Sequence, residues 1–316
     1  MPAAIETLGL TRRFGKRLAV DAISMTVPGR SIYGFLGRNG AGKTTTIKLL
    51  LGLLHADAGS ARIAGIDIAR DRLGAARKVG TLLEAQGFYP QLSGRENLDL
   101  TRRLLGLRAP EIDRALEVTE MAAHGRRRVA DYSLGMRQRL GLARAMLGAP
   151  SVLILDEPTN GLDPEGIADM RGFLRELPAR SGATVLLSSH LLGEIEQTAT
   201  HIGILSHGRL VLEGALSELK AGLATEVAIE TDTPERALLV AREHGFDVAR
   251  DDDVPDKGVV VARFAAGEDV RHATSALNRV LCIAGGIRIH ALAPRRRSLE
   301  TLYRNAALAA APAALA

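Results

Sequence analysis

The sequence contains no tryptophan, and aromatic residues make up only 3% of its 316 residues. Proteins that bind single-stranded nucleic acid stack the bases on aromatic side chains, and this chain has few to offer. The formal net charge of +5 leaves an acidic partner open and is the only feature that favours one. We therefore expect no nucleic-acid partner.

The sequence has a single cysteine, Cys282, so no disulfide can form within the chain. One cysteine is typical of a protein in a reducing compartment, and it excludes a disulfide framework. One thiol also cannot supply a cysteine-based metal cluster. We expect Cys282 to be a buried structural thiol rather than a reactive one.

Long apolar runs are also missing, because no segment approaches the roughly 18 to 20 apolar residues that a membrane-spanning helix needs. Residues 1–10 lack the charged-then-apolar layout of a signal peptide. We expect the chain to stay in the cytoplasm and to reach any membrane through a partner. A length of 316 residues is enough for one large α/β domain and a small one, and 46% hydrophobic with 24% charged residues is ordinary for a globular protein.

Residues 37–44 form the glycine-rich loop GRNGAGKT, set between an apolar run at 32–36 and a helical pattern at 45–54. The loop has three glycines, at Gly37, Gly40 and Gly42. Glycines let backbone N–H groups turn inward around phosphate oxygens, and the following helix points its positive N-terminus at the same place. Because Lys43 adds a positive charge and Thr44 a hydroxyl for Mg²⁺, the spacing predicts a nucleoside triphosphate site.

Two carboxylates follow an apolar run at 152–155 that is typical of a strand buried in a parallel sheet. Open α/β sheets keep their chemistry at such strand ends. Asp156 suits a Mg²⁺ contact, and Glu157 suits the polarisation of a water that attacks the γ-phosphate; two solvated turn carboxylates are the poorer alternative. His190 ends the next apparent strand, 184–189, where its ring N–H reaches the same phosphate, with a structural histidine as the alternative.

Two further residues are candidates that also have plainer interpretations. Phe14 lies on a predicted polar turn at 11–16, where it stacks on a nucleotide base or simply packs against the protein. Ser133 precedes a predicted helix at 136–147. Its hydroxyl and the helix amides form a second anion site, or Ser133 is a simple helix cap.

The order of predicted elements divides the chain into two domains, 1–222 and 223–316. Further strands of the first domain are predicted at 5–10, 18–27, 61–68, 78–84, 202–206 and 209–213, and helices at 96–107, 111–121 and 216–223. The first two of these helices belong to an all-helical insertion at about 90–147.

The second domain is predicted to be a small α+β module. Its predicted order is strand 226–230, helix 234–244, strands 247–250 and 259–264, helix 267–283 and strand 287–292. This βαββαβ order resembles a ferredoxin-like module. It shows no catalytic constellation, so binding a regulatory ligand and completing a dimer are both compatible with it. Residues 298–308 look helical, and the alanine-rich end is expected to fray.

Residues 5 to about 214 resemble the ATP-binding subunits of ABC transporters. The motifs that carry this resemblance are GRNGAGKT, similar to Walker A, VLILDEP, similar to Walker B, NGLD, similar to the D-loop, and SSH, similar to the switch-histidine motif. Phe14 falls at the aromatic of the A-loop. The segment YSLGM, residues 132–136, falls at the signature usually written LSGGQ.

The resemblance implies an α/β fold of the P-loop NTPase class, with a mixed sheet and a helical insertion, and the cofactors ATP and Mg²⁺. The implied catalytic residues are Glu157, His190 and Glu84. The implied ATP-binding residues are Phe14, Gly37, Asn39, Gly40, Ala41, Gly42, Lys43, Thr44, Thr45, Ser133 and Gly135. The implied Mg²⁺ ligands are Thr44, Asp156 and Glu84.

The chain departs from the family pattern at two places. Leu134 and Met136 replace one glycine and the glutamine of the usual signature, so we expect weaker hydrogen bonding to the opposed nucleotide. Glu84 stands where the family usually has the Q-loop glutamine. A carboxylate can still contact Mg²⁺ or its water, but it cannot donate a hydrogen bond, so the link between nucleotide and membrane subunit is altered in character.

With FYPQLSGRENL and SSHLLGEIEQ, the motifs resemble the bacterial exporter branch that handles bacitracin, lantibiotics and related drugs. The resemblance implies an antibiotic-resistance ATPase that energises export through a separate membrane permease. It implies a homodimer, with each ATP between Walker A of one copy and the signature of the other, lying peripherally on the cytoplasmic face of the cell membrane. The alternative is a soluble ABC ATPase acting on ribosomes or nucleic acid, but such proteins generally resemble two fused halves or carry a long coiled coil.

Overall fold

The computed structural model describes residues 2–83, 87–221, 225–251, 259–265 and 268–296. The chain divides into two compact units, the first ending at Leu216 and the second beginning at Ser217. The boundary predicted at residue 222 falls outside the described residues. Each unit has a hydrophobic core built from its own residues.

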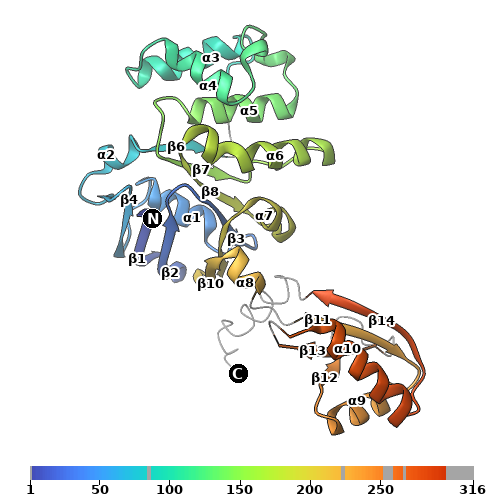
Figure 1. Cartoon of the computed structure of the whole chain (residues 1–316). Coiled ribbons are helices and arrows are strands. Elements are labelled where there is room, and N and C mark those ends of the chain that lie inside the picture. The colour runs from blue at the N-terminus through green and yellow to red at the C-terminus, as the bar shows by residue number, and fades with distance from the viewer. Residues whose placement is uncertain (1, 84–86, 222–224, 252–258, 266–267, 297–316) are drawn as a thin grey trace. The chain divides into compact units, whose positions relative to one another are not determined.

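A six-stranded sheet with the order β10-β9-β3-β8-β7-β6 forms the centre of the first unit (Figure 1). Three of its strands are buried along their whole length: β3 (Ile32–Gly37), β7 (Val152–Asp156) and β8 (Thr184–Ser189). Apolar runs of this kind are favoured where both faces of a parallel sheet are covered. All neighbours pair in parallel except β9 (His201–Ser206) and β10 (Arg209–Ala215), so the sheet is mixed, as predicted.

A second, antiparallel sheet of the first unit has the order β2-β1-β4-β5. Its strands are β1 (Ala3–Phe14), β2 (Arg17–Pro28), β4 (Ala58–Ile63) and β5 (Ile66–Asp67). The predicted polar turn at 11–16 is wrong, because β1 continues to Phe14 and only Gly15 and Lys16 form the turn. Pairing with β2, as between Arg12 and Val20, keeps this polar segment extended, so tertiary context outweighs local propensity.

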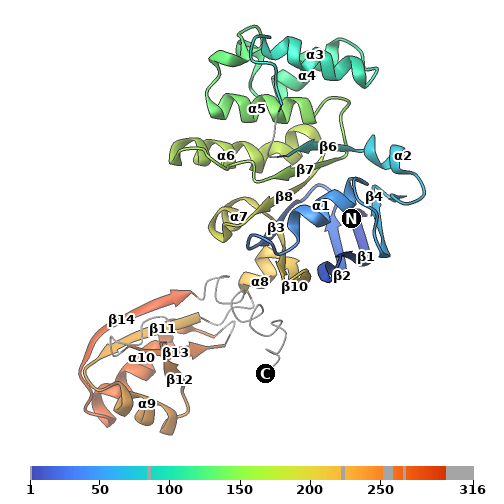
Figure 2. The same ribbon diagram turned by 180° about the vertical axis from the view of Figure 1, so that it is seen from behind.

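Three helices gather at one end of the first unit in both views (Figures 1 and 2): α3 (Gly94–Leu104), α4 (Pro110–Val118) and α5 (Leu134–Ala145). Short 3-10 turns at Ala122–His124 and Val129–Asp131 lie between α4 and α5. The three helices share a small core that includes Leu98, Leu116 and Leu140. This layer is the helical insertion that the sequence predicts at about 90–147.

Serine caps place the starts of two of these helices earlier than the apolar period predicts. Ser93 and Glu96 form a reciprocal capping box, so α3 begins at Gly94 rather than at residue 96. The Ser133 side chain accepts a hydrogen bond from the Met136 amide at 3.2 Å, so α5 begins at Leu134 rather than at residue 136.

The remaining elements of the first unit are α1 (Lys43–Leu50), α2 (Arg72–Ala76), β6 (Val79–Leu82), α6 (Pro164–Ser181) and α7 (Leu192–Thr198). Helix α8 (Leu216–Ala221) begins at the last residue of the first unit and continues into the second. Strand β6 ends at Leu82, short of the predicted end at residue 84. Among the described residues, none of the helices combines the length and the apolar character needed to cross a membrane.

The second unit has the predicted element order βαββαβ. Its elements are β11 (Thr225–Thr231), α9 (Pro234–Glu243), β12 (Asp247–Arg250), β13 (Val259–Phe264), α10 (Val270–Arg279) and β14 (Ile289–Arg296). The sheet order is β12-β13-β11-β14 and every neighbouring pair is antiparallel. Alternate strand residues such as Val227 and Ile229 share a core with Leu277 of α10, so the helices cover one face of this sheet (Figure 2).

The expectation of a buried thiol is wrong, because Cys282 is exposed. It lies in a π-helical turn, Val280–Ala284, that follows α10. Leu281 in this turn points into the core of the second unit and is fully buried. The neighbouring Cys282 therefore faces outward, where its Sγ lies 3.4 Å from Oδ1 of Asn278.

Candidate functional site

The glycine-rich loop connects the end of β3 to the first residue of α1. Its backbone has positive φ at Gly40 (82°) and Gly42 (114°), a conformation that favours glycine. A Cβ on Gly42 would lie 2.5 Å from the carbonyl oxygen of Ala19, so no larger residue fits there without movement. The loop therefore brings the N-terminus of α1 to the end of a central strand, which is the arrangement that binds phosphate.

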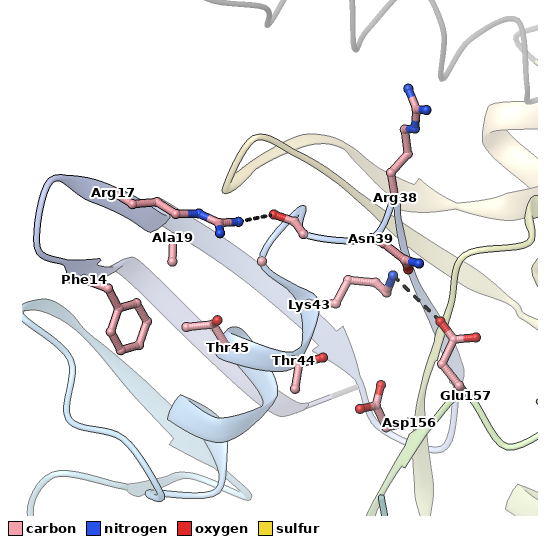
Figure 3. Close-up of a pocket in the computed structure, with 12 residues that line it drawn as sticks. Phe14, Arg17, Ala19, Arg38, Asn39, Lys43, Thr44, Thr45, Asp156 and Glu157 are labelled. Atoms are coloured by element: carbon pink, nitrogen blue, oxygen red, sulfur yellow. Dashed lines mark hydrogen bonds and ion pairs between the residues drawn. The ribbon is translucent and has the colours of Figure 1, made fainter. Parts of the chain in front are cut away.

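Lys43 folds back over this loop. Its Nζ donates a hydrogen bond to the Gly37 carbonyl at 2.5 Å and lies 3.8 Å from Oε1 of Glu157 (Figure 3). Burial lowers the pKa of Lys43, while the carboxylates of Glu157 and Asp156 act in the opposite direction. A poorly hydrated ammonium of this kind gains strongly from an anionic ligand that enters beside it.

The two carboxylates stand where the sequence places them. Asp156 ends β7 and is buried, and its Oδ1 accepts a hydrogen bond from the Ser188 hydroxyl. The backbone of Glu157 has φ 50° and is held by its amide, which donates to the Ser188 carbonyl at 3.2 Å. The Glu157 side chain is only 12% exposed, so the alternative of two solvated turn carboxylates is wrong.

His190 is brought to the same place by the end of β8. Its Nδ1 lies 2.8 Å from Oε2 of Glu157. The carboxylate of Glu157 thus stands between Lys43 on one oxygen and His190 on the other. Sequence reasoning missed Ser188 of β8, whose hydroxyl donates to Asp156 and whose carbonyl accepts from the Glu157 amide. The signal that could have found it is its place in the SSH motif beside His190.

Lys43, Asp156 and Glu157 line a cavity of about 530 Å³, with Phe14 at one end of the row of labelled side chains and Glu157 at the other (Figure 3). His190 does not line this cavity and meets it only through its contact with Glu157. The predicted site residues that line it are Phe14, Asn39, Gly40, Gly42, Lys43, Thr44, Thr45, Asp156 and Glu157. Gly37 contributes its carbonyl to the Lys43 bond, and Ala41 is buried in the core of the unit.

Two arginines of this cavity were not predicted. Arg38 lines it, and Arg17 does so while its Nη2 donates to the Gly40 carbonyl at 2.9 Å. Arg17 begins β2 and pairs with Phe14, so the fold of the antiparallel sheet brings it to the loop. The only sequence signal for the contact between Arg17 and Gly40 was that Arg17 lies three residues after Phe14, the candidate base-stacking residue.

The structure does not bring every predicted residue together within one chain. Ser133 and Gly135 line a different cavity, also of about 530 Å³, which shares no lining residue with the first. Its wall includes Gly161 and Leu162 of the NGLD turn. Glu84, predicted as a catalytic residue and Mg²⁺ ligand, lies outside the described residues.

A central strand that runs into a phosphate-binding loop, with a buried carboxylate pair facing the loop lysine, defines a P-loop protein that binds a nucleoside triphosphate. Comparison with known proteins narrows this class. The model of the ABC transporter family matches residues 20–160.

Two relatives extend the similarity over nearly the whole chain. The bacitracin transport ATP-binding protein BcrA of Bacillus licheniformis is 37% identical over 304 residues, covering 96% of this chain and 97% of the relative. The daunorubicin resistance ATP-binding protein DrrA3 of Streptomyces coeruleorubidus is 37% identical over 309 residues, covering 95% and 94%.

The fold is also found in a solved structure, cbiO1 from Clostridium perfringens, described as part of the ABC transporter complex cbiONQ. The TM-score is 0.64 at 21% identity, covering 69% of this chain and 91% of that one. The chain therefore belongs to the family of ATP-binding subunits of ABC transporters, and it is an ATP-binding ATPase.

Proposed function

We propose that this chain powers the export of a drug- or peptide-like molecule through a separate membrane-spanning permease. The observation that carries the ATPase part is the placement of Glu157 between Lys43 and His190 at the edge of the phosphate cavity. The names of BcrA and DrrA3 refer to bacitracin transport and daunorubicin resistance, and both relatives match the chain over both units. This supports a substrate of similar chemical class.

In this proposal, the phosphates of ATP lie along the backbone N–H groups of residues 37–44, and Lys43 exchanges the Gly37 carbonyl for phosphate oxygens. Asn39 and Thr45 complete the cavity wall beside the phosphates. Phe14, which is 45% exposed, offers its ring to the adenine. In this arrangement, residues of a single chain contact both the adenine and the phosphates of ATP.

The residues present also fit Mg²⁺. Thr44 and Asp156 bring a hydroxyl and a carboxylate to one cavity, and such oxygen ligands together with substrate phosphates are what Mg²⁺ uses. Among the described residues, no cluster of three or more His, Cys, Asp or Glu side chains forms a separate metal site. When bound, Mg²⁺ neutralises charge that develops on the phosphates. Glu84 stays a further candidate ligand.

For hydrolysis, we assign Glu157 to orient and polarise the attacking water, because it ends the cavity wall and is largely buried. His190 contacts the other oxygen of that carboxylate, and we assign its ring N–H to a hydrogen bond with the γ-phosphate. Ser188 positions both carboxylates from β8.

We further propose that two copies pair head to tail, so that Ser133 and Gly135 of one copy face the ATP of the other. The support is that these residues line a cavity separate from the phosphate loop of their own chain, where they cannot serve the same nucleotide. A two-fold contact of this kind completes two sites with one gene product. Hydrolysis then releases the contact and resets the permease at the cytoplasmic face of the membrane.

The test is affinity isolation of the tagged Glu157→Gln chain from gently solubilised native membranes in the presence of ATP, followed by mass spectrometry. We expect a multi-span membrane protein in equal amount, and its cavity then directs a search for the substrate. The control is the Lys43→Ala chain, which we expect to hold less ATP. Recovery of ribosomal proteins or nucleic acid, with the chain absent from membranes, would contradict the exporter proposal and leave only the ATPase chemistry.

A further inference from the structure

The ring of Phe14 has an arginine over one of its faces. The guanidinium carbon of Arg12 lies 4.9 Å from the centroid of the ring, within the range of a cation–π contact. Phe14 lines the nucleotide cavity, whereas Arg12 does not. The guanidinium thus covers one face of a ring that also borders the cavity, and the 45% exposure of Phe14 leaves part of the ring accessible.

Arg12 is itself held in place by the segment that precedes β4. Its Nη1 donates to Oδ1 of Asp57 at 2.8 Å and to the His55 carbonyl at 3.1 Å. Asp57 is fixed in turn, because its Oδ2 accepts a hydrogen bond from the Arg13 amide at 2.6 Å. The guanidinium is therefore ordered by the protein alone, before any nucleotide enters.

We infer that Arg12 is a positioning residue for the base of ATP. Held by Asp57, it fixes the Phe14 ring with one face toward the cavity, and the adenine stacks on that face. This inference rests on the proposed contact between Phe14 and the base. It adds that the contact depends on a residue that does not touch ATP.

The physical reason is that ordering a side chain costs free energy. Phe14 is the last residue of β1, beside a two-residue turn, and its exposed ring would otherwise sample several rotamers. A ring that Arg12 already holds loses less freedom when the base stacks on it. Side chains immobilised on binding cost enough to change an affinity by about 3- to 10-fold.

The experiment uses the full-length Arg12→Met chain, in which the unbranched stem remains and the guanidinium is lost. The dissociation constants of ATP and of inorganic triphosphate, which has no base, are measured by calorimetry in the presence of Mg²⁺. We expect ATP to bind about 3- to 10-fold more weakly, and triphosphate to bind as before, which also shows that the phosphate loop is intact. The matched control is Arg13→Met, the same change one residue along β1, which we expect to alter neither constant.

Asp57→Asn is the second variant, because it keeps Arg12 and weakens its anchor; we expect a smaller loss for ATP only. Phe14→Ala should weaken ATP about 5- to 100-fold by removing the stacking surface. In that background Arg12→Met should add nothing, since the two residues act as one unit.

Four results would overturn the inference, and they separate it from the proposed base contact. If Arg12→Met weakens triphosphate as well, or weakens ATP equally without Phe14, Arg12 supports the fold rather than the base. If Phe14→Ala weakens ATP but Arg12→Met does not, only the inference about Arg12 is wrong. If Phe14→Ala leaves ATP binding unchanged, the proposed base contact fails and the inference fails with it.

Discussion

At the scale of single residues, Glu157 is held by both its backbone and its side chain. It is not a glycine, yet its φ of 50° lies in the left-handed region, which costs free energy and is maintained by hydrogen bonds from its amide to Ser188 and from the Asn160 amide to its carbonyl. This backbone directs the carboxylate between Lys43 and His190. A strained, largely buried carboxylate beside a phosphate loop is what a water-orienting group needs.

We expect Glu157→Gln to lower ATP turnover by about 10²- to 10⁴-fold, because an amide cannot take a proton from the attacking water. ATP binding should persist, since the cavity wall keeps its shape, and ATP-dependent dimers should accumulate. Turnover is measured by phosphate release, and the dimer by size-exclusion chromatography with ATP. Unchanged hydrolysis would remove Glu157 from the base role.

Lys43 makes ATP binding depend on pH. Burial lowers the pKa of Lys43 in the free protein, and only the charged ammonium attracts the phosphates. ATP affinity should therefore fall as pH rises through this lowered pKa, before the ordinary lysine range near about 10.4 is reached. Calorimetric titrations at a series of alkaline pH values measure the fall. Lys43→Arg, whose guanidinium stays charged, should bind ATP with a flat profile; an equal fall in that variant would assign the titration to another group.

The residues that sequence reasoning located are those whose chemistry depends on local spacing. The phosphate loop and the Asp156–Glu157 pair follow from glycine positions and from a buried run that ends in carboxylates, and the structure places both at one cavity. Ser188 and Arg17 were missed because their contacts join segments far apart in the chain. Cys282 is exposed because it lies on the outer side of a π-helical turn. The apolar character of the surrounding sequence does not determine on which side of the turn a residue lies.

At the scale of elements, the NGLD turn lies between β7 and α6 and packs against the first residue of α5 in the helical insertion. Leu134, at the start of α5, reaches within 3.3 Å of where a Cβ on Gly161 would lie. Asp163 closes the turn by capping α6, accepting a hydrogen bond from the Gly166 amide at 2.9 Å. Leu134, which departs from the usual signature, therefore faces the turn that follows Glu157. It lines the cavity of Ser133 and Gly135, and it also lines a further cavity that Asp156, Glu157 and Asn160 border.

Gly161→Ala tests the rigidity of this turn. Gly161 has φ +78°, so a Cβ there should lower the free energy of unfolding by about 1–2 kcal/mol. The matched control is Gly172→Ala in α6, where a Cβ meets open space and the helix gains about 0.5–1 kcal/mol. Urea unfolding of both variants measures the two effects. Equal midpoints for the two variants would mean that the turn tolerates a side chain.

The sequence predicts where helices and strands lie to within a few residues, but it does not predict the order of the strands in the sheet. The helices of the insertion were expected from their period, and two of them, α3 and α5, begin two residues earlier than expected because Ser93 and Ser133 cap them. The position of β3 between β8 and β9 has no local signal, since it joins strands far apart in the chain. Local patterns predict elements, while the neighbours of each strand are set by the packing of the whole sheet.

At the scale of the whole molecule, all described groups of the proposed ATP site and of the signature cavity lie in the first unit. The second unit has its own core and its own antiparallel sheet. Because the two cores share no residue, removal of the second unit takes no side chain from the core around the phosphate loop. The catalytic chemistry and the ATP-dependent contact between copies should therefore belong to the first unit alone.

We therefore expect a chain truncated after residue 222 to bind ATP with unchanged affinity and, as the Glu157→Gln variant, to form ATP-dependent dimers. Calorimetry and size-exclusion chromatography measure the two properties beside the full-length Glu157→Gln chain. If the truncated chain binds ATP but stays monomeric, the second unit completes the dimer, because the nucleotide site is then shown to be intact. If both properties persist, the second unit has no part in the dimer, and a regulatory ligand becomes the role to examine for it.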